Sequence, residues 1–181
     1  LTMKPQTASG LFQKILIANR GEIACRIHRT CQNLGIPTVA VYSEADQDAL
    51  HVRLEDDAFH IGQATPEDSY LNHERILETA IQCQADAIHP GYGFLAENDV
   101  FAEACLSKGI HFIGPRPESI REMGSKSRAK QLMQEAGVPV VPGYHGDKQD
   151  FKILRNEAEK IGFPVLILSL IHISEPTRLE P

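Results

Sequence analysis

Short apolar segments alternate along this chain with amphipathic segments of helical periodicity, and this alternation constrains the fold more than any other feature. Residues 14–18 (KILIA) and 38–42 (TVAVY) are apolar runs of the kind expected for strands that are covered on both faces. The gaps between such runs are too long for hairpins, whereas parallel strands need crossover connections of that length. The pattern therefore predicts an α/β fold, an open sheet of parallel strands with helices packed against it.

The expected strands can be placed from the apolar runs, and the first helix from its periodicity. Strands are expected over residues 14–18, 38–42, 58–61, 86–89 and 110–113. In the helix expected over 22–34, the apolar side chains fall on one stripe that includes Leu34. Gly35 follows directly and is expected to end this helix.

Two later helices are expected to begin at asparagine caps. Asn72 and Asn98 each precede a helical pattern, and an asparagine side chain can accept a hydrogen bond from the first turn. The apolar stripe of each helix is expected to face the core. The first stripe includes Ile81 and the second includes Leu106.

A change in pattern after Gly114 predicts a domain boundary near residues 115–124. Prolines interrupt the chain there, and further helices are expected over 126–136, capped by Ser125, and over 151–161. We therefore divide the chain into an N-terminal extension, a first domain, the start of a second domain, and a tail, over residues 1–11, 12–123, 124–167 and 168–181.

Composition argues against several classes of partner. The formal net charge is −6, and no segment is basic enough for the electrostatic footprint of a nucleic-acid-binding protein. The longest apolar run, 165–173, is about half of the roughly 18 residues that a membrane span needs. The four cysteines lack C-x-x-C spacing and are expected to be buried. The eight histidines show no metal-ligand spacing. From these observations we expect no nucleic-acid partner, no membrane span and no metal ligand in this chain.

Two loops follow expected strands at their carboxyl ends, where open α/β sheets bind ligands. Residues 19–22 (NRGE) follow the first strand, and residues 89–95 (HPGYGFL) follow the fourth, so both are expected at the same edge of the sheet. The first loop lacks G-x-G-x-x-G and does not offer a dinucleotide pyrophosphate its usual backbone approach. The alternative for residues 19–22 is a tight turn in which Arg20 and Glu22 make structural hydrogen bonds, and spacing alone favours this turn. For residues 89–95 the alternative is a turn shaped by the glycines and packed rings, and there both interpretations stay open.

Three cations, Lys126, Arg128 and Lys130, lie at the start of one expected helix. A helix N-terminus carries about +0.5 charge, so cations there are unfavourable unless an anion neutralises them. A bound phosphate would do so. Three solvated side chains are the alternative interpretation.

Several segments taken together resemble a known family. KILIANRGEIACRI, HPGYGFLAEN, FIGP, MGSKSRAK and GVPVVPGYHG occur in the order found in the biotin carboxylase component of biotin-dependent carboxylases. The resemblance covers residues 12–167. Within that family, GVPVVPGYHGDKQD is most similar to the biotin-containing α subunits that serve methylcrotonoyl-CoA carboxylase. Acetyl-, propionyl- and geranyl-CoA carboxylases are close relatives, so the acyl-CoA stays open.

The resemblance implies a fold, a reaction and partners. It implies a Rossmann-like N-terminal (pre-ATP-grasp) domain over 12–123 and the incomplete start of an ATP-grasp domain over 124–167. The family uses ATP with Mg²⁺ or Mn²⁺ to activate bicarbonate as carboxyphosphate, and then carboxylates biotin on a carrier domain. A carboxyltransferase (β) subunit and a second copy of the chain, in a homodimer or larger oligomer, are the implied protein partners. The implied compartment is the bacterial cytoplasm, or the mitochondrial matrix in a eukaryote.

The resemblance also implies roles for three residues. Lys126 matches a lysine that contacts ATP, which agrees with the anion considered for that helix start. Glu97 matches a position lining the active-site side of the N-terminal domain, and Arg29 matches a position at the dimer interface. The family's ligands for magnesium, bicarbonate and biotin lie further along the chain, so no catalytic or metal-ligating residue is expected here.

The sequence departs from the family pattern after GFPVLI. Leu168 stands where the family has a lysine, and the following SLIHISEPTRLEP has no glycine, whereas the family continues with a glycine-rich loop that covers phosphate. Residues 168–181 are therefore expected to be a non-native tail, and the chain to be a truncated and inactive piece of the enzyme. A non-catalytic nucleotide-binding module is the alternative, while an NAD-dependent dehydrogenase is disfavoured by the missing glycine fingerprint.

Overall fold

The computed structural model describes residues 12–55, 57–124, 126–144, 146, 148 and 150–166, without the side chains of Lys126 and Ser127. The chain divides into two compact units, Leu1–Gly124 and Ser125–Pro181, and each is described by itself. Three sequence predictions lie outside the described residues. They are the extension 1–11, the cap Ser125 and the tail 168–181.

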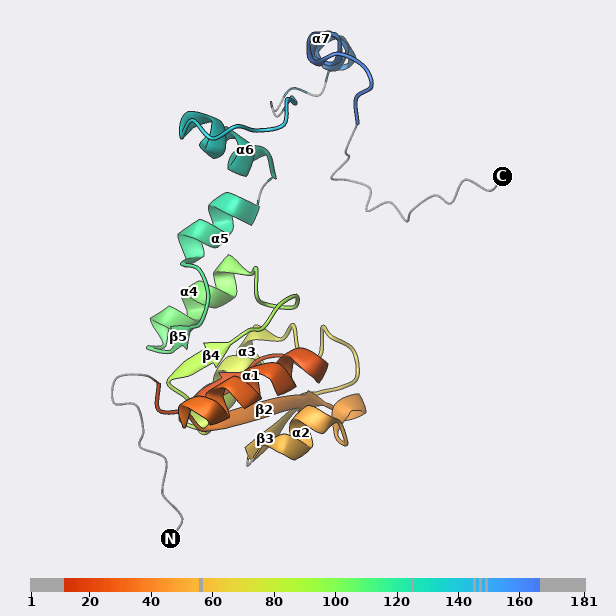
Figure 1. Ribbon diagram of the computed structural model, residues 1–181. Helices are drawn as coiled ribbons and strands as arrows, with labels where there is room; N and C mark the ends of the chain where they lie inside the picture. The colour runs from red at the N-terminus through yellow and green to blue at the C-terminus, as the bar shows by residue number, and fades with distance from the viewer. Residues whose placement is uncertain are drawn as a thin grey trace. The chain divides into compact units, whose positions relative to one another are not determined.

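A five-stranded parallel sheet forms the centre of the first unit (Figure 1). In chain order its strands are β1 (Ile15–Ile17), β2 (Thr38–Ser43), β3 (Asp57–Gly62), β4 (Ala87–His89) and β5 (His111–Phe112). Their order across the sheet is β3-β2-β1-β4-β5, and each neighbouring pair is parallel. The predicted α/β class is confirmed, and each predicted strand ends within one residue of the observed one.

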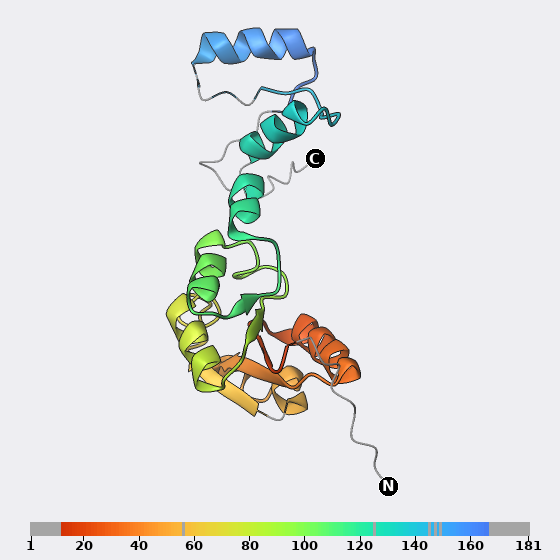
Figure 2. The same ribbon diagram turned by 90° about the vertical axis from the view of Figure 1, so that its left-hand side faces the viewer.

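Helices cover both faces of this sheet. In chain order, the helices of the first unit are α1 (Gly21–Leu34), the short 3-10 helix η1 (Glu44–Asp46), α2 (Leu50–Leu54), α3 (His73–Gln82), α4 (Asp99–Ser107) and α5 (Pro117–Gly124). One face carries α1 with α2 beside it, and the opposite face carries α3 and α4 (Figures 1 and 2). The caps are as predicted, because the side chains of Asn72 and Asn98 accept hydrogen bonds from the backbone N–H groups of Arg75 and Phe101.

Strand β1 is buried on both faces and joins two apolar clusters. Ile15 and Ile17 belong to the cluster under α1. Leu16 points to the opposite face, where it shares a cluster with Ile76 of α3 and Phe101 of α4. Because the side chains of a strand alternate between its faces, a strand covered on both sides is apolar throughout. Complete burial of each such side chain is worth about 1.5–3 kcal/mol.

Two apolar residues that were predicted to face the core point outward instead. Ile81 and Leu106 have 54% and 52% of their surface exposed. Each directly follows a buried residue, Ala80 or Cys105, and one residue along a helix turns the side chain by about 100°. A helix that rests on a sheet buries only the stripe in contact with it. The predicted stripes were therefore one residue too wide.

Leu34, at the end of α1, was also predicted to lie on the apolar stripe, but 46% of its surface is exposed. Gly35 ends the helix as predicted, with a φ of 70°, and its N–H donates to the carbonyl of Gln32 at 3.1 Å. The next N–H, that of Ile36, donates to the carbonyl of Cys31 at 2.9 Å. This helix-ending motif folds the chain back over the last turn. Ile36 is buried as a result, and Leu34 is not.

The second unit contains α6 (Lys126–Glu135) and α7 (Phe151–Ile161), at the positions where helices were predicted. Asp150 caps α7 by accepting a hydrogen bond from the backbone N–H of Lys152 at 2.8 Å. None of the residues described in this unit is buried. The packed core of the described chain therefore belongs to the first unit.

Gly62, at the end of β3, allows a test of how closely the first unit is packed. Its φ is 146°, and a Cβ would overlap the backbone carbonyl oxygen of Asp68. We expect Gly62→Ala to lower the free energy of unfolding by about 2–6 kcal/mol, because an unfavourable φ and overpacking each cost roughly 1–3 kcal/mol. Urea unfolding of the purified chain measures this change.

Gly109→Ala is the matched control. Gly109 also has a positive φ, 73°, but a Cβ would meet no atom within 4 Å. This variant should lose only about 1–2 kcal/mol from the backbone conformation. Equal losses for the two variants would contradict the close packing of β3 against Asp68.

Candidate functional site

The loops that follow β1 and β4 meet at one edge of the sheet, as predicted. The buried side chain of Asn19 joins them, since its Nδ2 donates to the carbonyl oxygens of Pro90 at 2.7 Å and Tyr92 at 2.8 Å. Its Oδ1 accepts from the backbone N–H of Arg20 at 2.8 Å. The strand order reverses between β1 and β4, and open α/β sheets bind ligands beside the carboxyl ends of strands at such a point.

A cavity of about 400 Å³ lies between these loops, lined by residues 19–23 and 92–94. The hydroxyl of Tyr92 donates a hydrogen bond to the carboxylate of Glu22, and this bond raises the pKa of Tyr92. Arg20 precedes α1, and its side chain makes no capping hydrogen bond to the helix. The wall thus combines a guanidinium, a carboxylate and a phenol with the backbone at a helix start. This set of groups suits a charged or strongly polar ligand.

Gly91 allows the second loop to approach Asn19 closely. Its φ is 67°, and a Cβ on it would lie 2.8 Å from Nδ2 of Asn19. His89 supports the same turn, because its Nδ1 accepts from the N–H of Gly91 at 3.0 Å. Burial, and then the charge of Arg26, lower the pKa of His89, so the ring stays neutral and its Nδ1 can accept. The geometry therefore favours the structural interpretation of His89.

A second polar cluster lies at the same edge, beyond the carboxyl end of β2. Oδ2 of Asp46 accepts from the hydroxyls of Tyr70 and Ser43 and pairs with the guanidinium of Arg20. The buried ring of Tyr70 stacks on Phe94, with 5.1 Å between the ring centroids. No motif singled out Asp46 or Tyr70. The position of Asp46 just after β2 is a signal that could have found it, because the carboxyl ends of parallel strands share one edge.

Two of the residues to which the resemblance gives roles, Glu97 and Arg29, lie in the first unit. Glu97 is exposed in the turn before α4, Arg29 is exposed on α1, and neither lines the cavity. The backbone of Lys126 begins α6, but its side chain lies outside the described residues. The roles of all three stay predictions.

Histidine, cysteine and carboxylate side chains are the groups that could bind a metal ion or act as nucleophiles. Over the described ranges, no group of three or more His, Cys, Asp and Glu side chains could hold a metal ion. All four cysteines are buried, as predicted, and burial raises the pKa of each thiol, that of Cys105 to about 12. A thiol with such a pKa is protonated and unreactive, so these cysteines are packing residues. No helix in the described ranges is long and apolar enough to cross a membrane.

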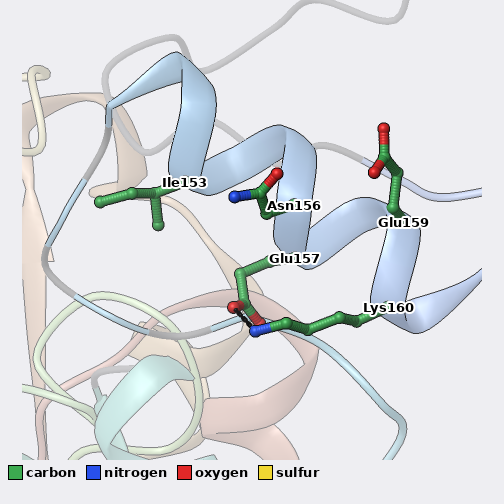
Figure 3. Close-up of a pocket in the computed structure, with 5 residues that line it drawn as sticks. All are labelled: Ile153, Asn156, Glu157, Glu159 and Lys160. Atoms are coloured by element: carbon green, nitrogen blue, oxygen red, sulfur yellow. Dashed lines mark hydrogen bonds and ion pairs between the residues drawn. The ribbon is translucent and has the colours of Figure 1, made fainter.

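A second hollow, of about 500 Å³, lies along α7 (Figure 3). Its lining residues all come from this one helix. The carboxylate of Glu157 pairs with the ammonium of Lys160 at 2.5 Å. Figure 3 shows this pair, with Glu159 pointing away from it. The surrounding unit has no buried residue in its described part, so the hollow is open helix surface. The candidate site is therefore the cavity between the β1 and β4 loops.

Two family models match successive parts of the chain. The model of the biotin carboxylase N-terminal domain matches residues 11–120. The chain belongs to the biotin carboxylase family. The model of the ATP-binding domain of the carbamoyl-phosphate synthase L chain matches residues 125–172. This second match includes residues 168–172, where the sequence pattern predicted the start of a non-native tail.

Individual relatives agree with the family. The mitochondrial methylcrotonoyl-CoA carboxylase α subunit of Oryza sativa is 57% identical over 155 residues, which are 86% of this chain and 21% of the relative. The 2-oxoglutarate carboxylase small subunit of Hydrogenobacter thermophilus is 53% identical over 157 residues, 87% of this chain and 33% of the relative. The predicted resemblance to biotin carboxylases and to methylcrotonoyl-CoA carboxylase α subunits is confirmed.

A solved structure shows the same fold. The biotin carboxylase domain of a thermophilic 2-oxoglutarate carboxylase, bound to bicarbonate, matches with a TM-score of 0.80 and 53% identity, over 87% of this chain and 35% of that one. The chain thus spans about a fifth to a third of the length of these proteins. In this chain, the cavity lies between two of the segments that carry the resemblance, ANRGE and HPGYGF.

Asn19→Asp tests the junction between the two loops. A carboxylate keeps the shape and can still accept from Arg20, but it cannot donate to the carbonyls of Pro90 and Tyr92. We expect a loss of about 2–5 kcal/mol in the free energy of unfolding, since buried acceptors are left unpaired beside a buried charge. Urea unfolding measures the loss, and hydrogen exchange over residues 90–93 should become faster.

Asn98→Asp is the control for this charge change. The side chain of Asn98 accepts a hydrogen bond from the N–H of Phe101 at 2.8 Å and donates none among the described residues, and a carboxylate can accept in the same way at a helix start. Its stability should change by less than about 0.5 kcal/mol. If both variants lose the same stability, the two donated bonds of Asn19 do not hold the loops together.

Proposed function

We propose that this chain is the N-terminal part of an ATP-dependent biotin carboxylase. In this function ATP with Mg²⁺ or Mn²⁺ activates bicarbonate, and the carboxyl group passes to biotin on a carrier domain. The observation that carries the proposal is the succession of two family matches, over residues 11–120 and 125–172. A related domain from Hydrogenobacter thermophilus, with a TM-score of 0.80, is described as a dimer in complex with MgADP, ADP and bicarbonate. Those ligands are of the classes that the proposal requires.

The described residues account for a limited part of this function. They form no metal-binding group, so the ligands of the Mg²⁺ ion would come from elsewhere in the protein. When bound, MgATP would supply the phosphoryl group that activates bicarbonate. The contribution we assign to this chain is a polar cavity wall held in place by Asn19 and a contact from Lys126 to ATP. Glu97, which lies outside this cavity, is proposed to face the active site of the full-length protein.

The substrate, partners and compartment are proposed from the same relatives. We infer methylcrotonoyl-CoA as the final acceptor, since α subunits of that carboxylase from Oryza sativa and Mus musculus are 57% and 55% identical to this chain. A biotin carrier domain, a carboxyltransferase (β) subunit and a second copy of the chain are then the partners. The names of those two relatives describe them as mitochondrial. For this chain we propose the mitochondrial matrix in a eukaryote, or the cytoplasm in a bacterium.

The test of the function uses the full-length protein. ADP release is measured with bicarbonate, with biotin, with both and with neither. We expect fast cleavage of ATP only when both are present, and no cleavage by the 181-residue chain. Cleavage that needs neither compound, or no cleavage by the full-length protein, would contradict the proposal.

Lys126→Ala in the full-length protein should weaken the use of ATP. Loss of one charge-assisted contact costs about 1.5–3 kcal/mol, or roughly ten- to a hundredfold in kcat/KM for ATP. Lys126→Arg should restore only part of this, because a guanidinium and an ammonium differ in shape. Lys152→Ala, on α7, is the control and should leave the kinetics unchanged. Unchanged kinetics for Lys126→Ala would make Lys126 a solvated surface residue.

Arg29→Glu should weaken self-association of the full-length protein. Arg29 is exposed on α1, and reversal of a charge at an interface introduces repulsion. We expect the dimer dissociation constant, measured by analytical ultracentrifugation, to rise about tenfold or more. Arg75→Glu is the control, because Arg75 is exposed on α3 at the opposite face of the sheet. Equal effects of both substitutions would show that net charge, and not an interface at α1, governs association.

A further inference from the structure

Asp46 connects β2 to one wall of the cavity. One of its oxygens, Oδ2, accepts hydrogen bonds from the hydroxyls of Tyr70 at 2.8 Å and Ser43 at 3.1 Å. The same oxygen forms an ion pair with the guanidinium of Arg20 at 3.2 Å. The Asp46 side chain is only 12% exposed, whereas that of Arg20 is 46% exposed. A shielded carboxylate with several donors holds its partner more firmly than an exposed ion pair does. Arg20 is therefore anchored on the protein side and accessible on the cavity side.

Tyr70 extends the same network to the other wall. Its ring is fully buried and stacks on Phe94, with 5.1 Å between centroids and 16° between the planes. The guanidinium carbon of Arg20 lies 5.8 Å from the centroid of the Tyr70 ring. Burial raises the pKa of Tyr70 to about 12, so its hydroxyl stays protonated and can donate to Asp46. The same oxygen accepts from the backbone N–H of Ser43 at 3.1 Å.

Phe94 depends on this support because of its backbone conformation. Its φ is 37°, in a region that residues with a Cβ rarely adopt and that costs about 1–3 kcal/mol. Such a conformation persists only where the surroundings hold it. The ring of Phe94 stacks on Tyr70 and packs against the apolar cluster that contains Leu16.

We propose that Asp46 and Tyr70 are positioning residues of this site. Asp46 directs the guanidinium of Arg20 toward the cavity, and Tyr70 holds the ring of Phe94 at the opposite wall. Neither Asp46 nor Tyr70 lines the cavity itself, so each acts through the residue it holds. The inference rests on the proposed function, because it assigns the cavity a part in turnover by the full-length carboxylase.

A double-mutant cycle tests the first half of the proposal. Asp46→Asn keeps an amide oxygen that can accept from Tyr70 and Ser43, but it removes the charge that holds Arg20. In the full-length protein we expect kcat/KM for biotin, measured as bicarbonate-dependent ATP cleavage, to fall about ten- to a hundredfold. In an Arg20→Gln background, Asp46→Asn should cause little further loss. Equal losses in both backgrounds, or no loss in either, would overturn the role of Asp46.

Three substitutions of tyrosines, two at Tyr70 and one at Tyr42, test the second half of the proposal. Tyr70→Phe keeps the ring against Phe94 and should retain kcat/KM within about threefold, whereas Tyr70→Leu loses the stack and should fall about tenfold. Tyr42→Phe is the matched control, because Tyr42 lies on β2 with its ring beside His60 and outside the cavity. If Tyr70→Leu lowers the urea midpoint but leaves kcat/KM at the value of Tyr70→Phe, the residue is merely structural and the proposal fails.

A readout that needs no turnover separates this inference from the proposed function. The unmodified full-length protein is measured first, and absence of bicarbonate- and biotin-dependent cleavage contradicts the function alone. Hydrogen exchange of the amides of residues 93–95 is then compared between Tyr70→Phe and Tyr70→Leu in the same protein. Faster exchange in Tyr70→Leu supports the positioning of Phe94, and equal exchange overturns it.

Discussion

Burial of β1 on both faces is the constraint on which the rest of the first unit depends. Leu16 is fully buried in one apolar cluster, while Ile15 and Ile17 are buried in the other. A strand without an exposed face needs helices on both sides and a neighbour at each edge. Strands β2 and β4 are these neighbours, and the strand order reverses beside β1. The loops that leave β1 and β4 are thereby brought to one edge.

The candidate site follows from the same burial. Asn19 comes two residues after β1 and is only 3% exposed, so its polar atoms must find partners within the protein. It finds them in the carbonyls of Pro90 and Tyr92. One side chain therefore satisfies its own hydrogen bonds and also sets the separation of the two cavity walls. Arg20 and Phe94 then reach that cavity from a second network, centred on Asp46 and Tyr70.

Most of the fold could be predicted from short stretches of sequence. The features that depend on contacts between distant residues could not. The five strands, the caps Asn72 and Asn98 and the helix end at Gly35 follow from residues within a few positions of each other. The exposure of Ile81 and Leu106 depends on how each helix rests on the sheet, which periodicity does not specify. Helix α2, with five residues, is too short to show a period and was not predicted.

By itself, the sequence determined the parallel α/β class, the family and the common edge of the two loops. Apolar periodicity, the length of the connections between strands and the motifs of the family can all be read along the chain. Only the tertiary structure decided that Asn19 bonds across 71 residues to Pro90, and that Asp46 meets Tyr70 across 24. It also decided that His89 accepts a hydrogen bond within its own turn. The physical reason is that a polar side chain has many possible partners in an unfolded chain. Burial removes water as one of them and leaves the few groups that packing brings within reach.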